Sequence, residues 1–233
     1  CGSAVRWHDR FEEIDADGPI IVIANEFFDA LPVRQFVRTQ GAWAERCLGL
    51  NAEDDLVFGL APGRVDMKSI AARLPDVVEG AVIEVSPARA SVAHAISERL
   101  VRFGGAALVV DYGFAGPAAG DTLQAVKAHA YADVLAEPGE ADLTSHVDFT
   151  ALAEAFAAGG AVACGLTTQG EFLTRLGASA RVEKLKQSAS AAQADQVEAG
   201  YRRLTSPEAM GSLFKVLCAV WPASIQPAGF SGT

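Results

Sequence analysis

The sequence of 233 residues has few cysteines, no long apolar run and no excess of basic side chains. Its four cysteines are scattered, with neither a Cys-x-x-Cys pair nor a histidine at ligand spacing: Cys1, Cys47, Cys164 and Cys218. This pattern excludes the common zinc motifs and indicates no disulfide framework. We therefore expect no metal site, and reduced thiols in a cytoplasmic location.

The lack of long apolar runs and of basic charge limits the partners of the chain. No run approaches the ~20 residues that a membrane-spanning helix needs. The 19 basic and 29 acidic side chains give a formal net charge of -10, which opposes binding to nucleic acid or to anionic lipid. A basic protein partner fits this charge better than a nucleic acid or a membrane does.

What the chain does have is the pattern of an α/β protein. Residues 19–24 (PIIVIA) and 105–110 (GAALVV) are short apolar runs without alternation, typical of parallel strands covered on both faces. A helix is predicted over 86–103, because Ser86 can cap it and Gly104 suits its exit. We expect further helices at 147–158, 170–177 and 178–204, and strands at 161–165 and 213–220.

Polar side chains follow the first two predicted strands at the points where these strands end. Asn25, Glu26 and Asp29 follow the first, and Asp111 and Tyr112 follow the second. In open α/β sheets, ligands bind outside the carboxyl ends of the strands. The sequence therefore groups these five residues as one candidate site.

Two segments interrupt the alternation of strand and helix. Residues 33–62 alternate in hydrophobicity and contain turn signals, which predicts an antiparallel β-meander insertion. Residues 113–146 are rich in glycine, proline and polar residues, which predicts a long irregular loop that could act as a lid or contact a protein substrate. Glu84-Val85-Ser86-Pro87 could end a strand at a ribose, but we favour its interpretation as strand-to-helix punctuation.

Five segments resemble, in order, the MidA family of S-adenosylmethionine-dependent methyltransferases. They are residues 23–33 (IANEFFDALPV), 110–113 (VDYG), 142–149 (DLTSHVDF), 168–173 (TQGEFL) and 210–216 (MGSLFKV). The resemblance implies a Rossmann-like methyltransferase fold, with a mostly parallel sheet and helices on both faces. It also implies a protein-arginine methyltransferase of the type that modifies a subunit of respiratory complex I during assembly. Relatives of bacterial type would be cytoplasmic and eukaryotic ones mitochondrial.

By the same resemblance, residues 1–233 form the C-terminal part of one methyltransferase domain. The glycine-rich turn and the acidic strand end that hold S-adenosylmethionine in such enzymes would precede Val5, so the N-terminal strands would be missing and this chain alone would be inactive. Residues 5–7 would then lie near the third strand of the family fold. An apolar strand edge left open in this way would favour a partner or a homo-oligomer.

The chemistry of arginine methylation assigns roles to the candidates. Glu26, assisted by Asp29, would hold the substrate guanidinium, and Asn25 together with Glu26 would contact the cofactor. His146 would accept the released proton or bind substrate. Asp111 would bind substrate or brace the loop of Glu26, and Tyr112 would supply an aromatic wall.

Purely structural or non-catalytic roles remain as alternatives for these residues. Asp29 could simply cap its turn, and Thr144 or Ser145 could cap the following helix with His146 packed beside it. A non-catalytic binding or assembly factor for a basic protein segment is the alternative function. A nicotinamide dehydrogenase would need a glycine fingerprint, which the sequence does not offer.

Overall fold

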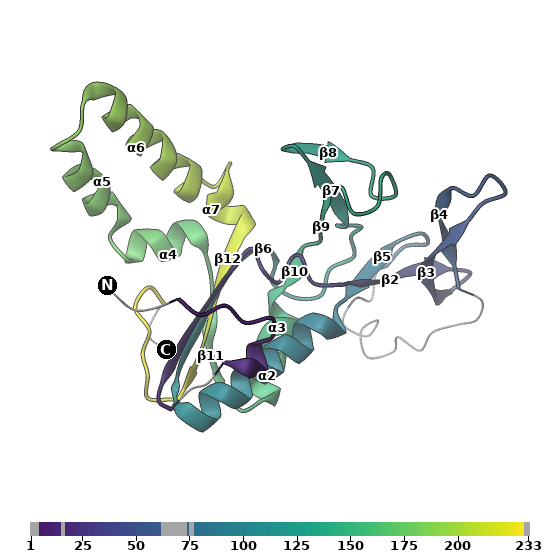
Figure 1. Cartoon of the computed structure of the whole chain (residues 1–233), viewed down its shortest axis with the longest axis horizontal. Helices are drawn as coiled ribbons and strands as arrows, with labels where there is room; N and C mark the ends of the chain where they lie inside the picture. Colours follow the sequence, from purple (N-terminus) through teal and green to yellow (C-terminus); the bar gives the residue numbers. More distant parts are fainter. Residues whose placement is uncertain (1–4, 15–16, 62–73, 75–76, 231–233) are drawn as a thin grey trace. The chain divides into compact units, whose positions relative to one another are not determined.

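The computed structural model describes residues 5–14, 17–61, 74 and 77–230, so Cys1 lies outside the described residues. Figure 1 labels the helices and strands of the chain. The chain divides into two compact units. The first contains residues 1–24, 90–110 and 152–233, and the second contains residues 25–89 and 111–151. Strands and helices occur in both units, which confirms the predicted α/β class.

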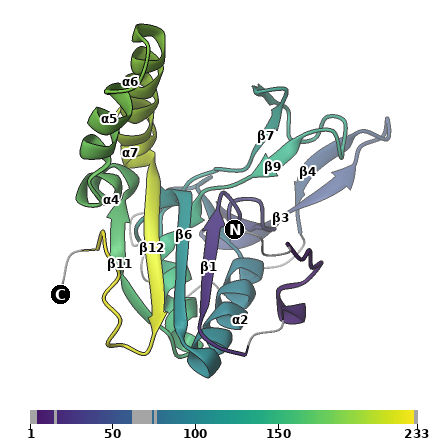
Figure 2. The ribbon, with the colours of Figure 1, turned by 60° about the vertical axis from the view of Figure 1, so that its left-hand side comes forward.

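The first unit is built on the main sheet of the protein, whose strands follow the order β1-β6-β12-β11 (Figure 2). These strands are β1 (Ile20–Asn25), β6 (Gly105–Phe114), β12 (Phe214–Trp221) and β11 (Val162–Thr168). β11 and β12 are antiparallel, and the short β10 (Val147–Asp148) pairs in parallel with the end of β6. The sheet is thus mixed, because the chain returns after β11 and places β12 beside it in the opposite direction.

β1 is not covered on both faces among the described residues, and that prediction is wrong. Ile21 and Ile23 are 82% and 70% exposed, whereas Ala24 is buried. Alternate residues of β1 point to one face of the sheet, and Ile21 and Ile23 remain exposed on that face among the described residues. Residues 5–7, expected near a strand, form no strand, and Trp7 is exposed.

Two helices supply the buried apolar side chains that complete this core. They are α2 (Pro87–Phe103) and α3 (Phe149–Ala158). Ile96 and Leu100 of α2 and Phe156 of α3 are buried, as are Val109 and Val216 of the sheet. The predicted ends of α2 are confirmed: the Ser86 hydroxyl accepts the Arg89 N–H at 3.2 Å, and Gly104 takes φ +80.

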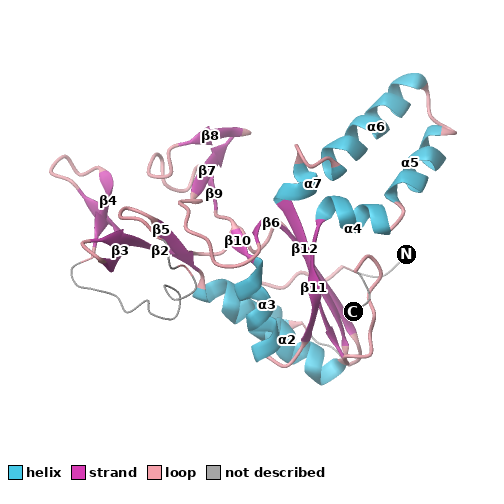
Figure 3. Cartoon of the chain, turned by 180° about the vertical axis from the view of Figure 1, so that it is seen from behind, coloured by secondary structure: helices cyan, strands magenta, loops and turns pink. Residues whose placement is uncertain are grey.

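The C-terminal helices form a group of their own (Figure 3). They are α4 (Gln169–Arg175), α5 (Ala178–Lys186), α6 (Ala191–Thr205) and α7 (Met210–Leu213), and a 3₁₀ turn, η1 (Phe11–Glu13), lies near the N-terminus. The single helix expected over 178–204 is two helices. The break occurs because Ser190 and Gln193 form a capping box that starts α6. No helix in the described ranges combines the length and apolar character that crossing a membrane requires.

The second unit contains a four-stranded antiparallel sheet in the order β4-β3-β2-β5. Its strands are β2 (Arg34–Thr39), β3 (Ala42–Leu50), β4 (Leu56–Leu60) and β5 (Val82–Val85). Phe36, Trp43 and Ile83 form its core. The hairpins are antiparallel as the turn signals at residues 40–41 and 51–55 predict, but the sheet extends beyond residues 33–62 because β5 pairs with β2.

The segment 113–146 is not irregular, and that prediction is wrong. It contains the antiparallel strands β7 (Gln124–Lys127), β8 (Ala130–Ala132) and β9 (Asp142–Thr144), in the order β8-β7-β9. These strands have three or four residues each and pair across turns, so their local sequence carries little strand signal. Gly113 permits the close approach of β10, since a Cβ there would collide with the backbone of Val147.

Candidate active site

The candidate site begins with a tight turn where β1 ends. Glu26, directly after Asn25, adopts a left-handed backbone with φ 47, which is unusual for a residue other than glycine. The chain then turns inward, so that Phe28 and Asp29 are buried, and the Leu31 N–H closes the turn on the Phe28 carbonyl at 3.2 Å. Asn25 and Glu26 stay exposed. The turn thus separates one exposed acid, Glu26, from one buried acid, Asp29.

Asp111 fixes this turn through its side chain. It lies inside β6 rather than after the strand as predicted, because β6 continues to Phe114. Its Oδ2 accepts the backbone N–H groups of Phe28 and Asp29, each at 3.1 Å, and its Oδ1 accepts that of Tyr112 at 3.0 Å. The side chain has no exposed surface. Because both carboxylate oxygens are engaged and buried, the geometry favours the bracing role that the sequence allowed, over direct binding of substrate.

The surroundings of Asp111 also change its acidity. Burial, with the charge of Asp29 beside it, raises the pKa of Asp111 to about 7, although the three backbone N–H groups act in the opposite direction. Burial and the hydrogen bond to Asp29 raise the pKa of Tyr112 to about 12. Tyr112 therefore stays a protonated donor at neutral pH.

Asp29 pairs with Tyr112. The Tyr112 hydroxyl donates to Asp29 Oδ2 at 2.6 Å, and Asp29 Oδ1 is buried without a hydrogen-bond partner in the described ranges. Asp29 is only 4% exposed. Its carboxylate therefore does not cap the turn. Because it is buried, it can assist Glu26 at a guanidinium only through Tyr112, whose hydroxyl donates to it.

His146 lies beside Tyr112, with ring centroids 5.4 Å apart in an edge-to-face arrangement. The helix after it is capped by neither Thr144 nor Ser145. Instead, Asp148 Oδ1 accepts the N–H groups of Thr150 at 2.9 Å and of Ala151 at 3.1 Å. The capping alternative of the sequence is thus wrong, and the structure brings His146 together with Tyr112, Asp29 and Asp111.

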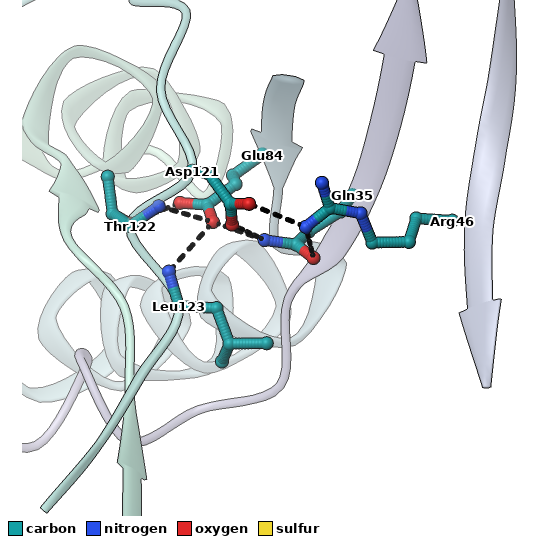
Figure 4. A network of polar contacts seen from close by, with 6 residues as sticks. All are labelled: Gln35, Arg46, Glu84, Asp121, Thr122 and Leu123. Carbon is teal, nitrogen blue, oxygen red and sulfur yellow. Dashed lines mark hydrogen bonds and ion pairs between the residues drawn. The ribbon is translucent and has the colours of Figure 1, made fainter. Parts of the chain in front are cut away.

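Residues 121–123, one of which contacts the His146 backbone, are held by a polar network centred on Glu84 (Figure 4). The Glu84 carboxylate accepts the Gln35 side-chain amide at 2.7 Å, the N–H groups of Thr122 and Leu123, and the Thr122 hydroxyl. Thr122 Oγ1 in turn accepts the His146 N–H at 2.8 Å. Glu84 lies in β5, and Ser86 lies between β5 and α2, as the punctuation interpretation predicts. Glu84 additionally holds residues 122–123.

A second acid extends this network to β3. Asp121 accepts the Gln35 amide at 2.8 Å and pairs with Arg46 Nη1 at 2.7 Å. Gln35 and Arg46 come from neighbouring strands of the four-stranded sheet. The start of segment 113–146 is therefore attached to that sheet by charged and polar groups.

Arg89 also belongs to this site, although no sequence motif predicted it. It is 7% exposed and donates to carbonyl groups of the Phe28–Asp29 turn and of Ser145–His146. A signal was present, because a basic side chain in the first turn of a helix opposes the helix dipole and needs another reason to be there.

Comparison with known proteins places this arrangement in a family. A family model described as "Putative S-adenosyl-L-methionine-dependent methyltransferase" matches residues 1–168. The mitochondrial protein arginine methyltransferase NDUFAF7 homolog of Drosophila melanogaster is 35% identical over 95% of this chain and 51% of its own length. The human NDUFAF7 protein is 33% identical over 91% of this chain and 48% of its own. The chain thus spans about half the length of the curated relatives it matches.

Solved structures agree with the sequence matches. A protein from Burkholderia thailandensis superposes with a TM-score of 0.81 at 30% identity, covering 98% of this chain and 59% of that one. A second structure from the same organism, bound to S-adenosyl-homocysteine, superposes with a TM-score of 0.77 at 27% identity, covering 98% and 57%.

The comparisons correct one expectation and settle another. The predicted cytoplasmic location is contradicted, because the curated relatives are mitochondrial by name. The predicted family is confirmed by the model match over residues 1–168, by the curated relatives and by both solved structures. The chain belongs to the MidA family of S-adenosyl-L-methionine-dependent methyltransferases.

Proposed function

We propose that this chain is the C-terminal part of a methyltransferase that uses S-adenosylmethionine to methylate arginine in a protein substrate. The observation that carries the proposal is the exposed Glu26 at the end of β1, held by a turn whose amides are fixed on buried Asp111. The names of the curated relatives support arginine as the acceptor, and the bound S-adenosyl-homocysteine of the Burkholderia neighbour supports the cofactor.

In this proposal the fold is Rossmann-like and the N-terminal strands lie outside the chain. Two observations support it: the chain spans about half of its relatives, and β1 ends the strand order with Ile21 and Ile23 exposed. Residues 33–62 are an insertion in a single methyltransferase domain, and residues 113–146 contact the protein substrate or act as a lid. The chain alone would be inactive, since the glycine-rich turn for the cofactor would precede it.

Asn25 and Glu26, at the end of β1, would contact the cofactor from one side. Asn25 and Glu26 are exposed polar groups at a strand end, where the ligands of such sheets bind. S-adenosylmethionine supplies an electrophilic methyl group. The part of the chain described here supplies the acceptor side of the reaction.

On the acceptor side, Glu26 holds and aligns the guanidinium through charge-assisted hydrogen bonds. Tyr112, with its hydroxyl on Asp29, provides an aromatic wall whose polar tip is fixed. His146, packed against Tyr112, accepts the proton that the guanidinium loses or binds the substrate segment. Asp111 keeps the turn in place from its buried position.

The proposed substrate is a basic protein segment, with a subunit of respiratory complex I as the first candidate. The net charge of -10 favours such a segment over nucleic acid or an anionic membrane. Without the N-terminal strands the isolated chain would leave the edge of β1 unpaired, so we expect homo-oligomerisation through this edge for the isolated chain.

Calorimetry distinguishes this enzyme from the alternative, a non-catalytic factor that only binds a basic segment. We expect titration of the full-length protein with S-adenosylmethionine to give saturable heat at one site per chain. A full-length protein that binds a basic peptide but gives no heat with the cofactor would support the binding factor instead. S-adenosylhomocysteine serves as the matched ligand, because it has the same adenosyl group without the methyl.

A further inference from the structure

We propose that Arg89 is the positioning residue that sets the distance between the Glu26 turn and His146, an inference that rests on the proposed function. Arg89 belongs to the first turn of α2 and is buried. Its long side chain connects the start of α2 to the Phe28–Asp29 turn and to Ser145–His146. Neither the comparisons nor the sequence motifs assign it a role.

All three nitrogens of the Arg89 guanidinium donate to the two segments that carry the proposed chemistry. Nε donates to the Phe28 carbonyl at 2.7 Å, and Nη1 donates to the His146 carbonyl at 2.7 Å. Nη2 donates to the Ser145 carbonyl at 2.8 Å, to the Ser145 hydroxyl at 2.7 Å and to the Asp29 carbonyl at 3.2 Å. One planar group thus holds two residues on each side.

Three further hydrogen bonds complete the arrangement, one between backbone groups and two made by the Ser86 hydroxyl. The Ser145 N–H donates to the Asp29 carbonyl at 3.0 Å, so the two segments also touch each other directly. At the root of the side chain, the Ser86 hydroxyl accepts the Arg89 N–H at 3.2 Å and donates to the Pro32 carbonyl at 2.6 Å. The start of α2 is therefore fixed to Pro32, which follows the Phe28–Asp29 turn, so the backbone of Arg89 is held in place.

The cost of burying this charge argues for a role beyond packing. Burial lowers the pKa of the Arg89 guanidinium, and the charges of Asp111, Glu84 and Asp29 act in the opposite direction. Its hydrogen-bond partners are carbonyls and one hydroxyl rather than a carboxylate. The cost of burying the charge is therefore offset directly by the number and alignment of these hydrogen bonds. A lysine would keep the charge but not the planar fork that matches four residues at once.

The inference is tested with Arg89→Lys and Arg89→Met in the full-length protein, and with Arg102→Met as the matched control. Arg102 is an exposed arginine of the same helix. The first readout is amide hydrogen exchange at Phe28, Asp29 and Ser145. We expect exchange to accelerate about tenfold in both Arg89 variants, because the turn and the Ser145 segment open locally, while the amides of β12 stay protected. Arg102→Met should exchange as the wild type does.

The second readout separates positioning from a merely structural role. Methyl transfer from labelled S-adenosylmethionine to arginine is measured with a protein extract of cells that lack the enzyme. Arg89→Lys should lower the rate at saturating cofactor about tenfold and leave the KM for S-adenosylmethionine unchanged. Arg89→Lys also carries the test if Arg89→Met does not fold.

Unchanged exchange in Arg89→Lys would overturn the inference, and so would faster exchange with an undiminished rate. A wild-type protein that labels no arginine would refute the proposed function instead. In that case the exchange data alone decide whether Arg89 holds the two segments.

Discussion

Glu26→Gln in the full-length protein is expected to lower methyl transfer at least about a hundredfold, because glutamine cannot form the charge-assisted hydrogen bonds that hold a guanidinium. The side chain is exposed at the turn after β1, so its loss should leave the fold intact. Binding of S-adenosylhomocysteine, measured by calorimetry, should stay close to the wild-type value. The rate is measured as transfer of labelled methyl groups to protein arginine.

Two variants control this experiment. Glu53→Gln removes an exposed carboxylate in the turn between β3 and β4 and should keep full activity. Glu26→Gly removes the carboxylate but suits the left-handed backbone at φ 47, so it should be as inactive as Glu26→Gln and no less stable than the wild type. Full activity in either Glu26 variant would remove Glu26 from the proposed mechanism.

Asp111→Ala is expected to destabilise the protein by about 3–5 kcal/mol, since it leaves three backbone N–H groups in a buried site without their acceptor. The measurement is urea denaturation of both proteins. Asp195→Ala, which removes an exposed carboxylate of α6, is the matched control and should change the free energy of unfolding little. A loss of less than about 1 kcal/mol would contradict the bracing role.

The same variant has an expected dependence on pH. The pKa of Asp111 in the folded protein is about 7, above its ordinary value of 3.8, so the folded state keeps a proton that the unfolded chain has lost. The contribution of Asp111 to the free energy of unfolding is therefore largest at low pH, and it falls as the pH rises from 3.8 to about 7. The difference between wild type and Asp111→Ala should thus be larger at about pH 5 than at about pH 8. A difference that grows with pH would contradict the raised pKa, because it would mean that the folded protein favours the charged form of Asp111.

The sequence predicted the strand-end part of the site because its signals are local. An apolar run followed directly by polar residues places Glu26 and Asp29 after β1. The same pattern predicted Asp111 and Tyr112 after the second strand, but β6 continues through them to Phe114. The helix boundaries at Ser86 and Gly104 depend on single residues with strong positional preferences. Such features need no knowledge of distant contacts.

The sequence could not predict the parts that depend on contacts between distant residues. Arg89 is 56 or more residues away in sequence from each carbonyl group that it holds in the Ser145 segment, and a long flexible side chain gives no sign of its direction. The strands β7 to β9 are too short for a periodic signal and form only by pairing. The exposure of Ile21 depends on what lies beside β1, which the apolar run itself does not specify.

The most direct test of the account is the fate of the transferred methyl group. The full-length protein is incubated with S-adenosylmethionine carrying an isotope-labelled methyl and with protein extract from cells that lack the enzyme, and the extract is then hydrolysed to amino acids. We expect the label in methylated arginine for the wild type and its near absence for Glu26→Gln. Label in another amino acid, or equal labelling by the two proteins, would contradict the account.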